Sequence, residues 1–169
     1  MSSPQTLIPI RIRPMRIEDL PAVIALDQRS FSLPWPESSF RFELESNELS
    51  RCWVSEITAP DGTVELAAMI VIWLIIDEAH VATIAVHPDF RRQKIAQRLL
   101  AHALTEAYHT GAVRSFLEVR RGNVAAIRMY ERFGYHETGV RKNYYQDNGE
   151  DAVLMDLDPL DLKRLTSLQ

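Results

Sequence analysis

The chain has 169 residues, of which 46% are hydrophobic and 25% are charged, and its formal net charge is −4. This composition is typical of soluble globular domains, so it excludes a disordered tail, a collagen-like fibre and a small disulfide-built protein. The acidic balance argues against sequence-independent binding to nucleic acid, which needs a strong basic field. We expect one globular domain that makes no direct contact with nucleic acid.

Cysteine, apolar and metal-ligand patterns narrow the class further. The single cysteine, Cys52, cannot form an intramolecular disulfide, and we expect a buried thiol in a strand rather than a nucleophile. The longest apolar run, residues 66–76, is too short for a membrane-spanning helix and is rich in Val and Ile, which favours a buried strand. No His or Cys pair has metal-ligand spacing. We expect a cytoplasmic protein that uses no metal and no membrane.

The hydrophobic pattern predicts helices and strands that alternate along the chain. In chain order we expect a strand at 10–12, a helix at 18–31 whose apolar stripe Asp27 interrupts, a helix from Pro36, strands at 51–57, 64–76 and 80–86, a helix at 92–110, a strand at 115–119, a helix at 123–132, and strands at 135–140 and 151–157. Turns are predicted at 60–62, 77–78 and 147–149, the last because Asn-Gly is a strong hairpin signal.

This order predicts an α/β (α+β) fold with a long antiparallel meander in the middle. Because a helix crosses between the strands at 80–86 and 115–119, those two strands could be parallel. We expect a mixed, mostly antiparallel sheet of about six to seven strands, flanked by about four helices. Residues 1–7 are expected to be a flexible tail, 8–158 the domain, and 159–169 a C-terminal tail.

A basic loop lies between the strand at 80–86 and the helix at 92–110. The N-terminus of a helix presents unpaired N–H groups and a partial positive charge, and Arg91, Arg92, Lys94 and Arg98 add full charges there. Such a loop can hold a phosphate or pyrophosphate, although an ordinary solvated helix start has the same composition.

The sequence RRQKIA at residues 91–96 resembles the acetyl-CoA pyrophosphate loop of the GNAT superfamily of N-acetyltransferases, whose pattern is Q/R-x-x-G-x-G/A. The first and last positions match, but Lys94 stands where the family has glycine. Glycine there lets the backbone approach the phosphates closely and adopt unusual dihedral angles. Lys94 is therefore expected to change how the loop holds the cofactor.

Three further segments resemble the RimI subfamily, the bacterial ribosomal-protein alanine N-acetyltransferases. They are LEVR at residues 117–120, MYERFGY at 129–135 and RKNYY at 141–145. With Phe40 and the loop before it, the resemblance extends over residues 10–157. It implies a GNAT fold and acetyl-CoA as co-substrate, held by Ile84, Ala85, Val86, Arg92, Gln93, Lys94, Ile95, Ala96, Gln97 and Asn123.

Acetyl transfer to an amine needs a base for the amine and an acid for the departing thiolate. The resemblance gives the base role to Glu118, acting through water, and the acid role to Tyr130. Glu118 could instead form an ion pair with Arg120 or Arg121. Tyr130 could instead be a core residue of its helix, and a tyrosine can serve in both ways because its ring and hydroxyl are separable.

Aromatic residues are candidates for the acceptor side. The resemblance places Tyr144 and Tyr145 beside the substrate N-terminus, and cross-strand packing is the alternative. Phe31 and Trp35 could wall a peptide groove or only pack their own loop. No histidine is assigned a catalytic role.

The resemblance implies direct transfer of acetyl to the α-amine of a protein N-terminus, most specifically the N-terminal alanine of ribosomal protein S18. A broader Nα-acetyltransferase, a small-amine or antibiotic acetyltransferase and a non-catalytic acyl-CoA-binding module remain alternatives, because one fold hosts many functions. We expect a monomer or a weak dimer.

Overall fold

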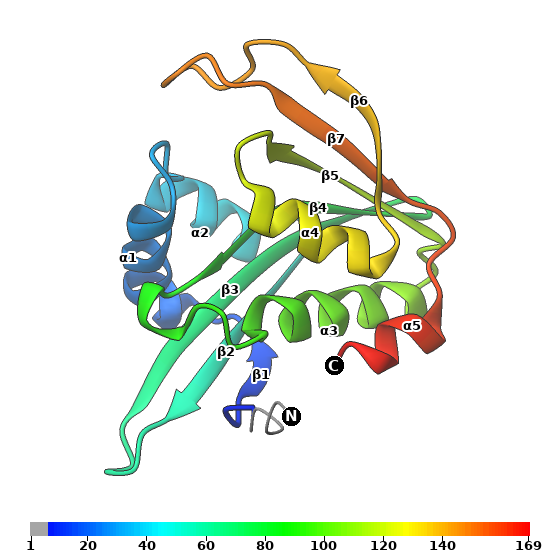
Figure 1. Ribbon diagram of the computed structural model, residues 1–169. Coiled ribbons are helices and arrows are strands. Elements are labelled where there is room, and N and C mark those ends of the chain that lie inside the picture. Colours follow the sequence, from blue (N-terminus) through cyan, green and yellow to red (C-terminus); the bar gives the residue numbers. More distant parts are fainter. Residues whose placement is uncertain (1–6) are drawn as a thin grey trace, which may run out of the picture.

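The structure is a computed structural model that describes residues 7–169. A seven-stranded sheet extends through these residues (Figure 1). Its strands are β1 (Arg11–Pro14), β2 (Ser50–Thr58), β3 (Val64–Ile75), β4 (Glu78–Val86), β5 (Arg114–Arg120), β6 (His136–Arg141) and β7 (Ala152–Leu157). They lie in the order β1-β2-β3-β4-β5-β7-β6, and every neighbouring pair is antiparallel except β4 and β5. The predicted fold class and the parallel pair are confirmed.

Helices cover both faces of this sheet (Figure 1). They are α1 (Leu20–Ser30), α2 (Glu37–Glu45), α3 (Ile95–His109), α4 (Val124–Phe133) and α5 (Leu162–Ser167). The apolar sides of α1 and α2 pack with Val54, Met69 and Val71 on one face. The helices α3, α4 and α5 form a larger core with the other face, because β-strand side chains alternate between faces. Within residues 7–169, no helix is long and apolar enough to cross a membrane.

Helix α4 begins and ends where the sequence predicts. The side chain of Asn123 accepts a hydrogen bond from the Ala126 backbone N–H at 3.3 Å, which caps the first turn. Gly134 ends the helix with φ of +101°, a left-handed conformation that glycine adopts without steric cost.

Most predicted boundaries differ from the observed ones by one to three residues. Helix α3 begins at Ile95 instead of residue 92, because Arg92 and Lys94 have φ of +63° and +58° and a right-handed helix cannot contain them. The β3–β4 turn is formed by Ile76 and Asp77, one residue earlier than expected. The predicted turn at 147–149 is present, one residue earlier at 146–148, but it lies within a longer loop of residues 142–151 between β6 and β7, so the Asn-Gly pair does not make a tight hairpin.

Residues 1–6 of the expected N-terminal tail lie outside the described residues. The expected C-terminal tail instead contains α5, which packs against α3 and places Leu160 and Leu165 in the larger core. A helix of this length carries little periodic signal, so its burial depends on packing rather than on local pattern.

The strands β4 and β5 diverge, and this divergence creates the site. They pair only between Glu78–Val81 and Arg114–Leu117, although β4 continues to Val86 and β5 to Arg120. The β3–β4 ladder also shifts register next to Ala82, a bulge of the kind that bends a strand. The facing edges beyond Val81 and Leu117 therefore keep backbone groups that no neighbouring strand pairs.

Candidate functional site

A cavity of about 1110 Å³ lies between the diverging strands. Its walls come from the ends of β4 and β5, the start of α3, one side of α4, the α1–α2 loop and the β6–β7 loop. This volume slightly exceeds the usual range for ligand sites, so a long cofactor and an acceptor can share the cavity.

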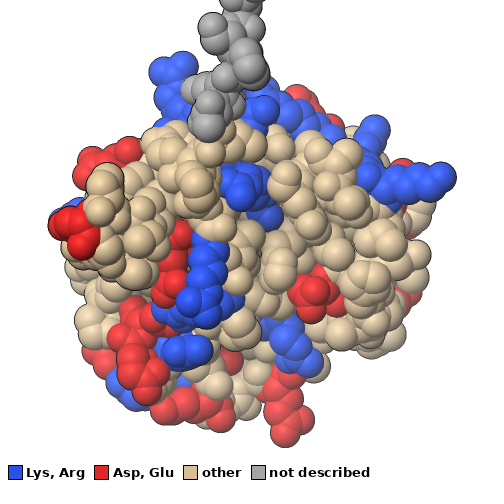
Figure 2. Space-filling model, turned by 90° about the horizontal axis from the view of Figure 1, so that it is seen from below, with Lys and Arg blue, Asp and Glu red and all other residues tan. Residues whose placement is uncertain are grey.

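The loop before α3 forms one end of the cavity. Arg92, Lys94, Ile95, Ala96 and Gln97 line it, together with Arg91 from the same loop. No side chain caps the first turn of α3, in contrast to α4 and α5, so its leading N–H groups are available to an anion. On the face seen in Figure 2, basic side chains lie in several separate groups, with acidic side chains among them.

One predicted cofactor residue of this loop does not line the cavity. Gln93 lies between the two left-handed residues, and its Oε1 is buried without a hydrogen-bond partner within residues 7–169. The other cofactor candidates outside the loop, Ile84, Ala85, Val86 and Asn123, do line it. The residues present therefore fit acetyl-CoA, with a helix start suited to the pyrophosphate at one end and unpaired strand edges suited to the pantetheine chain of the cofactor.

Glu118 lines the cavity at the point where β5 leaves β4. Its carboxylate forms an ion pair with Arg141 on β6 at 3.3 Å, not with Arg120 or Arg121 as the sequence suggested. The guanidinium of Arg120 turns to the β6–β7 loop, and that of Arg121 pairs with Glu137. Arg141 is exposed, whereas Glu118 is largely buried and lines the cavity.

Tyr130 extends from α4 into the same cavity, and its side chain is only 5% exposed. Its ring contacts that of Tyr135 edge to face, with centroids 5.6 Å apart, and the Tyr135 hydroxyl is held by Ser115 at 2.6 Å. Burial raises the pKa of Tyr130, so the hydroxyl keeps its proton at neutral pH. Both sequence interpretations of this residue are compatible with its position.

The four acceptor candidates separate into two groups. Phe31, Trp35 and Tyr145 line the cavity, whereas Tyr144 does not and is 43% exposed. Tyr144 nevertheless lies near the base candidate, and the negative charge of Glu118 raises the pKa of Tyr144. Its ring also meets the ring of Tyr145 edge to face at 5.2 Å.

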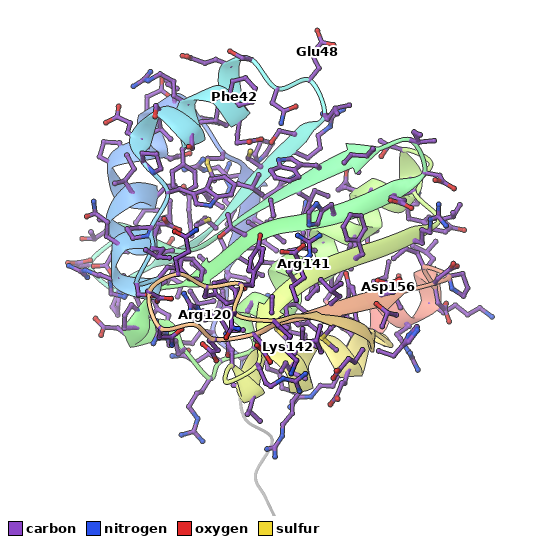
Figure 3. All side chains as sticks on the ribbon, turned by 90° about the horizontal axis from the view of Figure 1, so that it is seen from above. Phe42, Glu48, Arg120, Arg141, Lys142 and Asp156 are labelled. Atoms are coloured by element: carbon purple, nitrogen blue, oxygen red, sulfur yellow. The ribbon has the colours of Figure 1, made fainter. Side chains whose placement is uncertain are left out.

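Sequence reasoning missed the polar residues of the cavity mouth. Ser32 and Arg120 line the cavity with Asp147, Asn148 and Glu150 of the β6–β7 loop. Figure 3 shows Arg120 beside that loop, with Arg141 and Lys142 at its start. No local pattern reveals these contacts, since they join residues that lie between 27 and 115 positions apart in the chain. Within residues 7–169, no group of three or more potential metal ligands gathers anywhere.

Comparison with known proteins agrees with this geometry. The model of the acetyltransferase (GNAT) family matches residues 20–135. The ribosomal protein bS18-alanine N-acetyltransferase of Escherichia coli (strain K12) is 37% identical over 148 residues, which cover 86% of this chain and 95% of that protein.

Solved structures give the same picture. The crystal structure of the ribosomal-protein-S18-alanine N-acetyltransferase from Escherichia coli has a TM-score of 0.78 at 34% identity and covers 90% of this chain and 94% of that one. A structure of NAA60 from Arabidopsis thaliana in complex with acetyl-CoA shares the fold, with a TM-score of 0.81 at 17% identity and coverage of 89% and 98%. This chain therefore belongs to the GNAT family of N-acetyltransferases, in the RimI-like group that contains the ribosomal-protein alanine N-acetyltransferases.

Proposed function

We propose that this protein transfers an acetyl group from acetyl-CoA to the α-amine of a protein N-terminus, specifically the N-terminal alanine of ribosomal protein bS18, in the cytoplasm. The observation that carries the proposal is the shared cavity: an anion-binding helix start, Glu118, Tyr130 and an aromatic acceptor wall all face one space. The similarity to the Escherichia coli enzyme supports the choice of acceptor.

Glu118 is proposed as the base. An N-terminal amine is mostly protonated at neutral pH and attacks only after losing a proton, so a nearby carboxylate is needed. The carboxylate of Glu118 takes that proton through water, and Arg141 at 3.3 Å holds its orientation. The freed amine lone pair can then form the new C–N bond.

Tyr130 is proposed as the acid. Acetyl-CoA, when bound, supplies the acetyl group as a thioester, and the C–S bond breaks as the C–N bond forms. The hydroxyl of Tyr130 gives its proton to the leaving sulfur. Its raised pKa keeps that proton on the hydroxyl until the thiolate develops. The amine nitrogen loses its second proton as the C–N bond forms, and that proton returns through water to the tyrosine.

Direct transfer is favoured over an acyl-enzyme. The only cysteine, Cys52, lies in β2 and does not line the cavity. Burial raises the pKa of its thiol to about 11, so little thiolate is present at neutral pH.

An acceptor panel tests the proposal. Wild-type protein and acetyl-CoA are incubated with an N-terminal-alanine peptide of bS18, the same peptide with a blocked α-amine, other N-terminal peptides, a polyamine and an aminoglycoside. We expect acetyl on the free α-amine of the bS18 peptide, located by fragmentation mass spectrometry. Transfer to many N-termini would indicate a broader Nα-acetyltransferase, and transfer only to small amines would contradict the proposal.

Two variants test the chemistry in the same assay. Tyr130→Phe and Glu118→Gln should each lower kcat by about a hundredfold, the usual scale of general acid–base catalysis, while acetyl-CoA affinity stays within twofold. A wild-type rate in Tyr130→Phe would remove Tyr130 as the acid.

A further inference from the structure

Two loops that are distant in the chain meet at the mouth of the cavity. The α1–α2 loop supplies Ser32, whose hydroxyl donates a short hydrogen bond to the Asp147 carboxylate of the β6–β7 loop. Each loop also supplies an aromatic side chain to the cavity, Trp35 from the first and Tyr145 from the second. The position of one aromatic wall therefore depends on the position of the other.

Arg120, at the end of β5, joins these loops to the sheet. Its two terminal nitrogens contact the two Asp147 oxygens at 3.1 and 2.9 Å, a forked arrangement, and one also contacts Glu150 at 3.3 Å. The other terminal nitrogen also donates a hydrogen bond to the Ser32 hydroxyl at 3.3 Å. The planar guanidinium lies over the ring of Tyr145, 3.8 Å from its centroid, as in a cation–π contact.

The β6–β7 loop has a second attachment at the corner between β5 and α4. The Glu150 carboxylate accepts the Gly122 backbone N–H at 2.6 Å, and a Cβ at Gly122 would meet the same oxygen at 2.6 Å. The Tyr145 N–H donates to the Glu150 carbonyl at 3.1 Å, so Tyr145 is fixed to this corner.

We propose that Arg120, Ser32, Asp147 and Glu150 form a clasp in which Arg120 is the positioning residue for the acceptor. The clasp holds Tyr145 and the α1–α2 loop at the spacing that receives a peptide end, and Arg120 does not touch the reacting atoms. This inference rests on the proposed transfer to a peptide amine.

Charge makes Arg120 essential to the clasp. Two carboxylates, Asp147 and Glu150, lie close together on one loop and would repel one another without the guanidinium. The hydrogen bond from Ser32 and the charge of Arg120 lower the pKa of Asp147, so the carboxylate is ionised at neutral pH and needs its partner. Lysine cannot replace this residue fully, because an ammonium cannot make the forked contact or lie flat on the ring.

The test compares Arg120→Met, Arg120→Lys and Ser32→Ala with a matched control, Arg121→Met. Arg121 is the next residue, its side chain pairs within residues 7–169 only with the exposed Glu137, and it does not line the cavity. With the bS18 peptide as acceptor, Arg120→Met should raise the peptide KM about tenfold or more, as expected for loss of a forked charge-assisted contact. The KM for acetyl-CoA and kcat should stay within twofold, Arg120→Lys and Ser32→Ala should be intermediate, and the control should equal wild type.

Amide hydrogen exchange tests the clasp independently of catalytic activity. Arg120→Met should speed exchange in residues 31–35 and 142–151, but not in α3 or the central strands. If wild type acetylates no amine, the proposed function fails, and exchange alone then supports or refutes the clasp. Unchanged exchange in both loops, a lowered kcat with unchanged peptide KM, or exchange that rises throughout the protein would each overturn it.

Discussion

Asp27 interrupts the apolar stripe of the first helix, and the structure gives the reason. Its side chain has no exposed surface, and one carboxylate oxygen accepts the Trp35 backbone N–H at 2.7 Å. The other oxygen has no partner within residues 7–169. Asp27 therefore ties the α1–α2 loop to its helix, at the energetic cost of a buried, half-satisfied carboxylate.

This cost predicts a pH-dependent gain in stability for Asp27→Asn. Burial raises the folded-state pKa of Asp27 above the unfolded value of 3.8, so the wild type loses stability as pH rises through the folded pKa. Asparagine has no such titration and keeps an oxygen for the Trp35 N–H. The stability difference, variant minus wild type, should therefore increase between pH 3 and pH 7 in urea unfolding.

Asp61 provides a control of opposite sign. The Thr63 backbone N–H lowers the pKa of this exposed turn carboxylate, so its contribution is present above the unfolded pKa and is lost as pH falls. Asp61→Asn should thus become less stable than wild type as pH rises. If the free energies of unfolding of Asp27→Asn and wild type changed in parallel over pH 3–7, the buried Asp27 carboxylate would carry no energetic cost, and this explanation would be wrong.

At the level of elements, the start of α3 is unusual because Lys94 adopts a left-handed conformation there. A side chain in that region costs about 1 kcal/mol, and a positive charge at a helix N-terminus opposes the helix dipole. At the position where the family pattern has glycine, this chain keeps the left-handed backbone that glycine favours and adds the ammonium of Lys94. This combination makes sense if the ammonium acts on the anion that the helix start receives.

Replacing Lys94 by glycine or by alanine separates the effect of its charge on cofactor binding from the effect of its backbone conformation on stability. Both variants should weaken acetyl-CoA binding by about fivefold, because each removes one charge beside a pyrophosphate, and kcat should stay within twofold. Only alanine keeps the strained φ, so Lys94→Ala should unfold at lower urea concentration than Lys94→Gly. Calorimetric titration gives the affinities, and unaltered binding in both variants would show that the loop does not use this ammonium.

Local signals predicted most elements but not where they meet. The caps at Asn123 and Gly134 are encoded within a few residues, and the structure confirms them. Helix α3 begins three residues later than the sequence predicts, because positive φ values at non-glycine residues leave no pattern in composition. The contacts of Arg120 have no sequence signal for a different reason: ion-pair partners depend on tertiary approach, and Arg120 pairs with Asp147 and not with its neighbour Glu118.

On the scale of the whole molecule, the C-terminal segment is part of the core. Leu165 of α5 is almost fully buried against the larger core, and the Leu168 carbonyl accepts a hydrogen bond from Gln97 at 3.2 Å. Since Gln97 also lines the cavity, the last residues support the cofactor end of the site.

Shortening the buried side chain of Leu165 should destabilise the entire protein. Leu165→Ala should lower the free energy of unfolding by about 2–4 kcal/mol, the usual cost of removing a buried leucine side chain. Lys163→Ala, on the exposed side of the same helix, should change it by less than about 0.5 kcal/mol. Urea denaturation measures both, and equal small effects would mean that α5 is not docked in solution.

The short parallel joint between β4 and β5 also bears on how the chain is made. Strands β1 to β4 pair in chain order, and β5, β6 and β7 pair among themselves with β7 in the middle, so apart from the short β4–β5 ladder each strand pairs within its own half of the chain. During synthesis the first half can form its meander while the second half is still emerging, since domains are built from the N-terminus onward. The cavity takes walls from both halves, so the nascent chain gains its affinity for the cofactor only after β5 and α4 have left the ribosome.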